Sequence, residues 1–216
     1  MLISEIFFSF QGEGPLIGYP QIFIRFEGCN LNCSYCDEKH PPAKKQTISE
    51  VLDIIKPLLK NKPHSISITG GEPLLQVDSI KELIKELPLP IYLETNGTLP
   101  NHLIEIADQV TWFSVDFKPN YESEFIDFLN TLSNKPNVFV KYVITKDFPI
   151  QEAQKLAKII ATINENIPLI LQPVTAGSGY KSKASTKDIT RAFNITRKHL
   201  ENVRIIPQTH KIMNIK

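Results

Sequence analysis

The sequence predicts an α/β protein whose strands form a partial, splayed barrel of about six parallel strands, with small N- and C-terminal additions. Short runs rich in β-branched and aromatic residues alternate with amphipathic segments, a pattern typical of parallel strands joined by crossover helices. Polar residues and glycines gather where these runs end, as they do at the mouth of a barrel. A complete eightfold barrel takes about 250 residues. This chain has 216, so we expect an incomplete one.

Seven segments have the composition of strands, because each is short, apolar and rich in β-branched or aromatic residues. They are residues 21–26, 65–69, 91–94, 110–116, 138–145, 168–173 and 203–207.

Four segments have the apolar spacing of helices. In the first, Val51, Ile55 and Leu58 recur at helical intervals after Thr47 and Glu50, which form a capping-box pattern. The other three helices are expected at about residues 79–87, 150–163 and 186–200. Residues 40–45 and 176–185 have the composition of surface loops.

Composition and charge indicate one globular domain over residues 1–216. Hydrophobic residues make up 42% and charged residues 22%, which argues against disorder. Lys plus Arg is 24 and Asp plus Glu is 23, so we expect no nucleic-acid partner. A membrane helix needs roughly 18 to 20 apolar residues in a row, and no such run or targeting leader is present. We therefore expect a cytoplasmic protein without a membrane partner.

The three cysteines form one cluster. Cys29, Cys33 and Cys36 are spaced Cys-x3-Cys-x2-Cys directly after an expected strand, and the rest of the chain has none. An odd, clustered set indicates a metal-ligand site and not a disulfide framework. Three thiolates this close can hold three irons of a 4Fe–4S cluster and leave the fourth iron open to a small molecule. Two alternatives are a set of buried structural thiols and a zinc site completed by His40.

A Gly-Gly-Glu-Pro turn follows the second expected strand. In ITGGEP, residues 68–73, two glycines let the backbone come within hydrogen-bonding distance of a bound amino-acid head group, and Glu72 and Pro73 fix the turn. A zinc site leaves this turn unexplained, because zinc would need only the first forty residues.

The cysteine spacing and this turn together resemble the signature of the radical S-adenosylmethionine (SAM) enzymes. In that superfamily the open iron is chelated by the methionine moiety of SAM. The residue before the last cysteine, here Tyr35, lies near the adenine. The resemblance therefore implies a radical SAM core with a 4Fe–4S cluster on Cys29, Cys33 and Cys36.

Further segments resemble the 7-carboxy-7-deazaguanine synthase family over nearly the whole chain. The resemblance begins with QGEG at residues 11–14, Arg25 and GCNL at residues 28–31. It continues in LETNGT, FSVDFKP, QPV and PQTHK, which occupy residues 93–98, 113–119, 172–174 and 207–211.

A planar bicyclic substrate with amide, amino and carboxylate groups suits a carboxylate, an amide and a guanidinium, which Glu13, Gln11 and Arg25 offer. Glu13 as a solvated loop acid and Arg25 paired with Glu27 are the plain alternatives. The resemblance implies eight substrate-binding residues: Phe10, Gln11, Gly12, Glu13, Arg25, Thr69, His210 and Lys216.

The resemblance also implies a set of SAM-binding residues, most of them at strand ends. They are Tyr35, Asp37, Gly71, Glu72, Glu94, Ser114, Val115, Asp116, Gln172, Pro173, Val174 and Thr175. Any of them could be ordinary strand-end polarity, and Glu94 could instead cap the following helix.

The residues after the last cysteine depart from the family pattern. The family has Asp-Thr there, with the threonine on Mg²⁺, and this chain has Asp37-Glu38. Glutamate is also a hard oxygen ligand, so Glu38 is the expected Mg²⁺ ligand, although it is longer and charged.

The resemblance implies a lyase that converts 6-carboxy-5,6,7,8-tetrahydropterin to 7-carboxy-7-deazaguanine for queuosine or other 7-deazapurine biosynthesis. It implies a homodimer and a flavodoxin or ferredoxin as electron donor. A glycyl-radical-activating enzyme shares the cysteine spacing but would not need QGEG with Arg25. A non-catalytic zinc module remains the alternative from another class.

Overall fold

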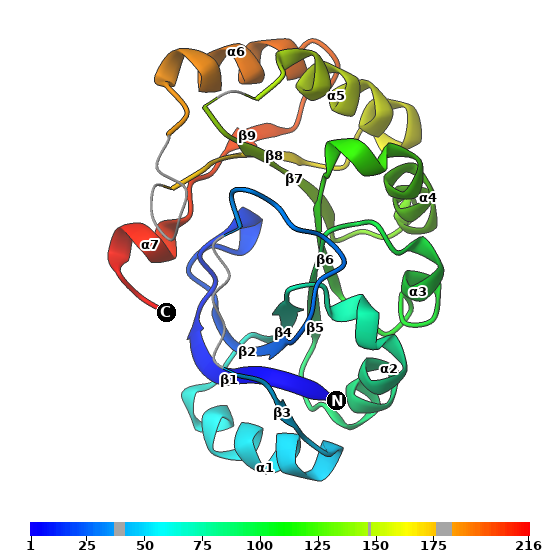
Figure 1. The fold of residues 1–216 in the computed structure, drawn as a ribbon, viewed down its shortest axis with the longest axis vertical. Coiled ribbons are helices and arrows are strands. Elements are labelled where there is room, and N and C mark those ends of the chain that lie inside the picture. The colour runs from blue at the N-terminus through cyan, green and yellow to red at the C-terminus, as the bar shows by residue number, and fades with distance from the viewer. Residues whose placement is uncertain (37–41, 147, 176–182) are drawn as a thin grey trace.

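The computed structural model describes residues 1–36, 42–146, 148–175 and 183–216. Its strands form one nine-stranded sheet in the order β3-β1-β2-β4-β5-β6-β7-β8-β9 (Figure 1). The strands are β1 (Leu2–Phe10), β2 (Pro20–Phe26), β3 (Lys44–Lys45), β4 (Ser65–Gly70), β5 (Ile91–Thr95), β6 (Trp112–Asp116), β7 (Val138–Ile144), β8 (Leu169–Pro173) and β9 (Val203–Ile205). The run from β2 through β4 to β9 is parallel, whereas β1 and β3 are antiparallel additions.

The α/β fold with a parallel sheet is confirmed, and each of the seven expected strand segments forms a strand. The parallel part thus has seven strands where about six were expected. The sequence analysis missed β1 and β3. Strand β1 is half exposed along most of its length, and β3 has only two residues, too few for a periodic pattern.

The helices are α1 (Ile48–Leu58), α2 (Val77–Glu86), α3 (Pro100–Ile104), α4 (Glu122–Leu132), α5 (Ile150–Asn164), α6 (Thr186–Thr196) and α7 (Thr209–Met213). Short 3-10 turns occupy Gly14–Leu16, Leu59–Asn61, Pro73–Gln76 and Pro119–Tyr121. The capping box that begins α1 is present, because Thr47 accepts from the Glu50 amide and Glu50 accepts from the Thr47 amide. Helix α4 was missed, although its buried Phe125, Phe128, Leu129 and Leu132 have helical spacing.

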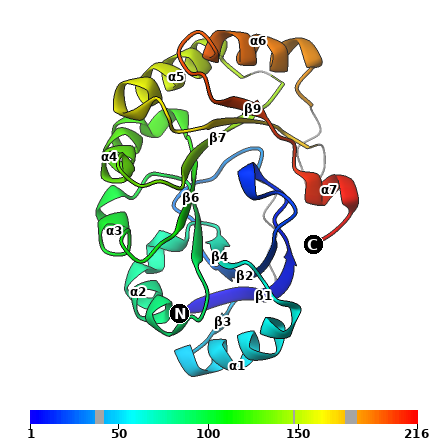
Figure 2. The ribbon, with the colours of Figure 1, turned by 180° about the vertical axis from the view of Figure 1, so that it is seen from behind.

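Figures 1 and 2 show the sheet curved into an open barrel, with α1 to α6 on its outer side and the loops after β1 and β2 on its inner side. The two-residue period of a strand sorts side chains between these sides. On β4, Ile66 and Ile68 belong to the main core under the helices, whereas Ser65, Ser67 and Thr69 alternate with them. The inner side is therefore a polar surface at the middle of the barrel.

An apolar cluster closes the inner side near the beginnings of the strands. Leu16 packs there with Tyr92, Phe139 and Ile170, each the second residue of its strand. Polar groups and cavities consequently lie at the carboxyl ends of the strands, where parallel α/β folds place their ligands. Within the described ranges, no helix is both long and apolar enough to cross a bilayer.

Candidate active site

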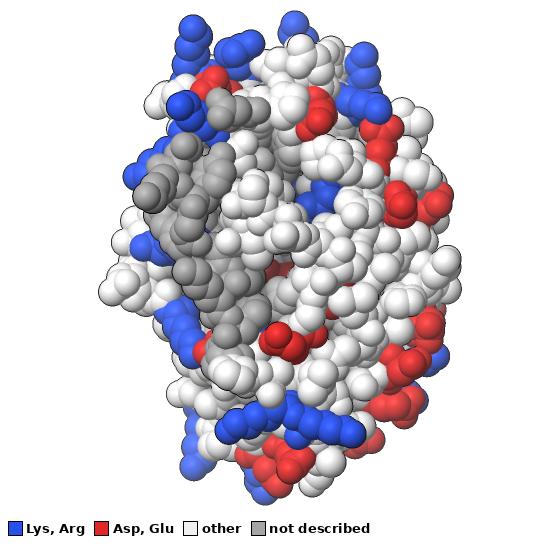
Figure 3. All heavy atoms as spheres, viewed as in Figure 1, with Lys and Arg blue, Asp and Glu red and all other residues white. Residues whose placement is uncertain are grey.

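Two adjoining cavities lie at the carboxyl ends of the parallel strands. The larger has a volume of about 340 Å³ and the smaller about 70 Å³. Glu13, Thr69, Glu94 and Gln208 line both, so the two spaces share a wall. Figure 3 shows Lys and Arg mainly round the rim of this face, and the middle of the face is mostly uncharged.

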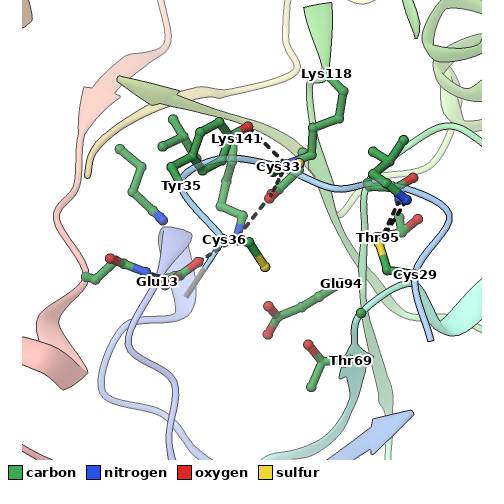
Figure 4. A pocket seen from close by; sticks show the side chains of 18 of the residues that line it. Glu13, Cys29, Cys33, Tyr35, Cys36, Thr69, Glu94, Thr95, Lys118 and Lys141 are labelled. Carbon is green, nitrogen blue, oxygen red and sulfur yellow. Dashed lines mark hydrogen bonds and ion pairs between the residues drawn. The ribbon is translucent and has the colours of Figure 1, made fainter. Parts of the chain in front are cut away.

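The cysteine loop forms one wall of the larger cavity (Figure 4). Its three thiols, all within the described part of the chain, are free, and those of Cys29 and Cys36 are exposed. The turn after β4 lies against this loop, where the Glu72 amide donates to Gly28 O at 2.8 Å. A Cβ on Gly71 would lie 2.3 Å from that same oxygen. The close approach explains why this turn requires glycine.

Three hydrogen-bonded side chains, those of Asn96, Asn30 and Thr98, form a triad next to the first cysteine. Asn96 Nδ2 donates to Asn30 Oδ1 at 2.8 Å, and Asn30 Nδ2 donates to Thr98 Oγ1 at 2.9 Å. Thr98 Oγ1 in turn donates to Asn96 Oδ1 at 2.6 Å. Asn96 Nδ2 also lies 4.0 Å from Cys29 Sγ. The triad therefore fixes an amide N–H group next to this thiol.

Glu72 lies beneath the turn and outside the cavity lining. Its fully buried carboxylate accepts from Leu74 N at 3.0 Å, Asn96 N at 2.7 Å and Thr95 Oγ1 at 2.9 Å. Burial raises the pKa of Glu72 to about 7, because desolvation outweighs these hydrogen bonds. The carboxylate thus joins the turn after β4 to the end of β5.

A buried lysine pairs with two acidic residues of the site. Lys141 Nζ lies 2.5 Å from Glu13 Oε2 and 3.1 Å from Asp116 Oδ1 (Figure 4). Gln208 Nε2 donates to Glu13 Oε1 at 2.8 Å. Burial would raise the pKa of Glu13, but the charge and hydrogen bond of Lys141 lower it to about 2. For Glu94, burial prevails and raises the pKa.

Gln11 anchors the loop after β1. Its Nε2 donates to Gln21 Oε1 and to Glu94 Oε1, each at 3.0 Å, and its Oε1 accepts from the Glu13 amide at 3.0 Å. Gln21 extends this hydrogen-bond network, because its Nε2 donates to Ser65 Oγ at 2.8 Å. Because both amide hydrogens of Gln11 are used within the protein, this side chain acts mainly on the position of its neighbours.

The C-terminal segment closes the smaller cavity against the loop after β1. Thr209 N donates to Gly12 O at 2.9 Å, and a Cβ on Gly12 would lie 2.2 Å from His210 Nδ1. Lys216 Nζ pairs with Glu5 at 2.6 Å. The smaller cavity brings together all eight residues expected to bind substrate: Phe10, Gln11, Gly12, Glu13, Arg25, Thr69, His210 and Lys216.

The chain is similar in sequence to known proteins over nearly its whole length. Residues 23–122 match the model of the radical SAM superfamily. The 7-carboxy-7-deazaguanine synthase of Geobacter sulfurreducens is 34% identical, with 98% of this chain and 96% of that protein covered. That of Methanothermobacter thermautotrophicus is 35% identical, with 99% and 97% covered. The chain belongs to the 7-carboxy-7-deazaguanine synthase family.

A solved structure agrees on the fold. The crystal structure of QueE from Escherichia coli matches with a TM-score of 0.68 and 21% identity, and the match covers 96% of this chain and 93% of that one. As a member of a radical SAM lyase family, the chain is an enzyme whose cofactors are a 4Fe–4S cluster and SAM.

The residues present fit these cofactors. Three free thiols from one loop, Cys29, Cys33 and Cys36, line a cavity large enough for a cluster and a small molecule beside it. His40, the fourth ligand of the zinc alternative, lies outside the described residues. Gln172 Oε1 lines the cavity and is buried without a hydrogen-bond partner among the described residues, so it can accept from a bound cofactor.

The structure places the SAM residues expected from sequence in three groups. Those that line the larger cavity are Tyr35, Gly71, Glu94, Asp116, Gln172, Val174 and Thr175. Glu72, Ser114, Val115 and Pro173 do not line it. The two-residue period turns Val115 into the core, and Ser114 is buried deeper on β6. Asp37 and Glu38, the expected Mg²⁺ ligand, lie outside the described residues.

Further polar residues that the sequence did not assign to the site also line the larger cavity, among them Asn96, Lys118, Lys141 and Gln208. Lys118 Nζ lies 5.4 Å from the centre of the Tyr35 ring and 3.4 Å from Asp116. Lys141 had a readable signal, because it is a single charge inside the apolar run FVKYVI. Gln208 lies in the segment PQTHK, but its pairing with Glu13, 195 residues away, cannot be read from that segment.

Proposed function

We propose that this chain converts 6-carboxy-5,6,7,8-tetrahydropterin to 7-carboxy-7-deazaguanine and ammonia. The proposal is supported by the family relationship together with one observation: the eight expected substrate residues line one small cavity that shares a wall with the cysteine-lined cavity. A substrate in the smaller space lies beside the cofactor, as a radical reaction requires.

In this proposal the three thiolates of Cys29, Cys33 and Cys36 hold the cluster, and SAM fills the rest of the larger cavity. When bound, these cofactors supply a 5′-deoxyadenosyl radical that removes a hydrogen atom from C6 of the substrate. Tyr35 lies against the adenine and Gly71 presents its backbone to the methionine moiety. Gln172 accepts a hydrogen bond through its buried oxygen.

The chain's own residues aim the substrate. The smaller cavity of about 70 Å³ is too small for a bicyclic ring, so the ring extends across the shared wall toward the cofactor. Glu13, held ionised by Lys141, accepts from the amino and amide N–H groups of the pyrimidine edge. Arg25 pairs with the substrate carboxylate. Closure by residues 207–211 excludes water and other hydrogen donors.

Three further features belong to the same proposal. Glu38 binds Mg²⁺ near the substrate in place of the family's threonine. The protein is a homodimer, and it accepts electrons from a flavodoxin or a ferredoxin. It works in the cytoplasm, without a nucleic-acid or membrane partner.

The test is an anaerobic assay of reconstituted protein with SAM, a chemical reductant and the tetrahydropterin, with and without Mg²⁺. We expect both 5′-deoxyadenosine and 7-carboxy-7-deazaguanine by mass spectrometry, and a higher rate with Mg²⁺. 5′-Deoxyadenosine without the deazaguanine would refute the substrate. If protein that carries iron and sulfide forms neither product, the radical reaction itself is refuted.

A further inference from the structure

A lysine stands in the interior of the barrel where an apolar residue would be expected. Lys141 is only 4% exposed, and its neighbours Phe139 and Val140 on β7 belong to apolar clusters. Burying an ammonium group is unfavourable unless it is paired. The buried ammonium group of Lys141 is therefore stabilised by its paired charges and not by apolar packing.

The partners of Lys141 come from the two compartments. Glu13 lies in the wall shared by both cavities, 2.5 Å from Nζ, whereas Asp116 lines only the larger cavity, 3.1 Å from Nζ. The second link is set by strand register, because Asp116 and Lys141 are direct partners in the parallel pair β6 and β7. The first reaches 128 residues back to the loop after β1.

We propose that Lys141 is a positioning residue that joins the two compartments, holding the Glu13 side chain toward substrate while it holds Asp116 toward the cofactor. The inference rests on the proposed function, in which Glu13 binds the pyrimidine edge. Lys141 acts through Glu13 and needs no contact with substrate. It thereby determines which atom of the substrate faces the cofactor.

The charges around Glu13 support this role. Glu94 and Asp116 also face Lys141, so several carboxylates share this ammonium group. His210 adds a smaller positive influence on Glu13 from the C-terminal segment. Without Lys141, burial would raise the pKa of Glu13, and its protonated form would lose an acceptor oxygen for the substrate. Gln208 would remain as a hydrogen-bond donor to Glu13 but brings no charge.

The experiment measures binding of 7-carboxy-7-deazaguanine, a stable product probe, to the reconstituted enzyme with SAM by calorimetry from pH 6 to pH 9. We expect wild-type affinity to change little over this range. Lys141→Met should bind at least tenfold more weakly at pH 6, with the deficit shrinking toward pH 9 as Glu13 ionises.

Two variants separate positioning from simple damage to the fold. Lys118→Met removes the other lysine beside Asp116. Because Lys118 does not contact Glu13, the ratio of wild-type affinity to Lys118→Met affinity should be independent of pH. Lys141→Met made in a Glu13→Gln background should weaken binding less than twofold further, because the group it acts on is already neutral. Lys141→Gln, which keeps a donor without a charge, should behave like Lys141→Met.

The assay also reports coupling between the compartments. Lys141→Met should form more 5′-deoxyadenosine per deazaguanine than wild type does, because SAM is cleaved beside a misplaced substrate. A pH-independent deficit, or an equal loss in the Glu13→Gln background, would overturn the proposal. Failure of the wild-type enzyme to bind the probe or form product would instead refute the proposed function.

Discussion

The cofactor side and the substrate side of this site are constructed differently. On the cofactor side, the cysteine loop and the turn after β4 meet through backbone groups, such as Gly71 against Gly28 O, where a Cβ would come within 2.3 Å. Around the smaller cavity, contacts join side chains far apart in the chain, such as Gln208 with Glu13 over 195 residues. The first arrangement depends on short motifs, and the second depends on how the whole barrel closes.

The difference extends to the two most perturbed acids. Glu72, under the turn on the cofactor side, has backbone and hydroxyl donors but no lysine, and burial raises its pKa to about 7. Glu13, on the substrate side, has Lys141 and a pKa of about 2. The opposite directions of these two pKa shifts therefore follow from the lysine beside Glu13, which Glu72 lacks.

The largest expected effect is on the cofactor side. Cys33→Ala should abolish stable iron binding and both products, because two thiolates cannot hold the cluster. The apo protein should keep its unfolding temperature, since Cys33 is partly exposed and lies outside the core clusters. Iron analysis, absorption spectra and a thermal melt check this. Ser34→Ala, at an exposed neighbouring position, is the matched control and should retain iron.

Glu72→Gln should change how stability depends on pH. The folded-state pKa of Glu72 is raised from 4.5 to about 7, so its stabilising effect is complete below pH 4.5 and is lost as pH rises through 7. At 1.36 kcal/mol per pKa unit, the free energy of unfolding of wild type should fall by about 3 kcal/mol relative to Glu72→Gln between pH 4 and pH 8. Urea unfolding of the apo proteins measures it. A constant difference across that range would contradict the raised pKa.

Glu13→Gln should show the opposite sign. The folded-state pKa of Glu13 is lowered from 4.5 to about 2, so its stabilising effect is present above pH 4.5 and is lost as pH falls through 2. Relative to Glu13→Gln, wild type should lose about 3 kcal/mol between pH 5 and pH 2. The same urea series extended to acid checks this, and equal acid sensitivity of the two proteins would sink it.

Gly12→Ala should damage the substrate side alone. The new Cβ would lie 2.2 Å from His210 Nδ1, which forces the C-terminal segment away from the loop after β1. Overpacking of this kind costs about 1 to 3 kcal/mol, so we expect the KM for the tetrahydropterin to rise about 10- to 100-fold. Substrate-independent cleavage of SAM should persist.

A second variant tests the cause of the Gly12→Ala effect. In a His210→Ala background, where the obstructing ring is gone, the same Gly12→Ala change should cost less than it does alone. An equal loss in both backgrounds would show that the glycine matters for another reason.

The smallest expected effect is again on the cofactor side. Asn30→Ala removes one hydrogen bond to Thr98 and one from Asn96, both at the exposed edge of the triad. Such bonds contribute about 1 kcal/mol each to the free energy of unfolding. We expect a loss of about 1 to 2 kcal/mol by urea unfolding with iron content unchanged. Loss of iron would mean that the triad holds the cysteine loop in place.

Sequence reasoning succeeded where the signal is contiguous. The cysteine spacing, the Gly-Gly-Glu-Pro turn and the period of the strands each lie within a short segment, and each was located correctly. Their partners could not be located that way. The pairing of Lys141 with Asp116 follows from the register of β6 and β7, and that of Glu13 with Gln208 follows from where α7 docks. Neither the strand register nor the docking position of α7 can be read from a short segment of the sequence.

The period of a strand also explains why consecutive residues expected to bind SAM do not all line the cavity. Ser114, Val115 and Asp116 are consecutive on β6, and the resemblance assigned all three to SAM. In a strand only alternate side chains share a face, so Val115 enters the core. Asp116 lines the cavity. A stricter use of the two-residue period would have divided the segment correctly.

The docking of residues 207–211 on the loop after β1 also has a consequence for the order of assembly. During synthesis the cysteine loop and the turn after β4 both emerge from the ribosome within the first half of the chain, where Glu72 N can reach Gly28 O. The wall that positions the substrate forms only when residues near the C-terminus reach Gly12. The groups that would hold the cluster are thus assembled before the chamber that would confine the radical, so the order of synthesis separates the two halves of the site in time.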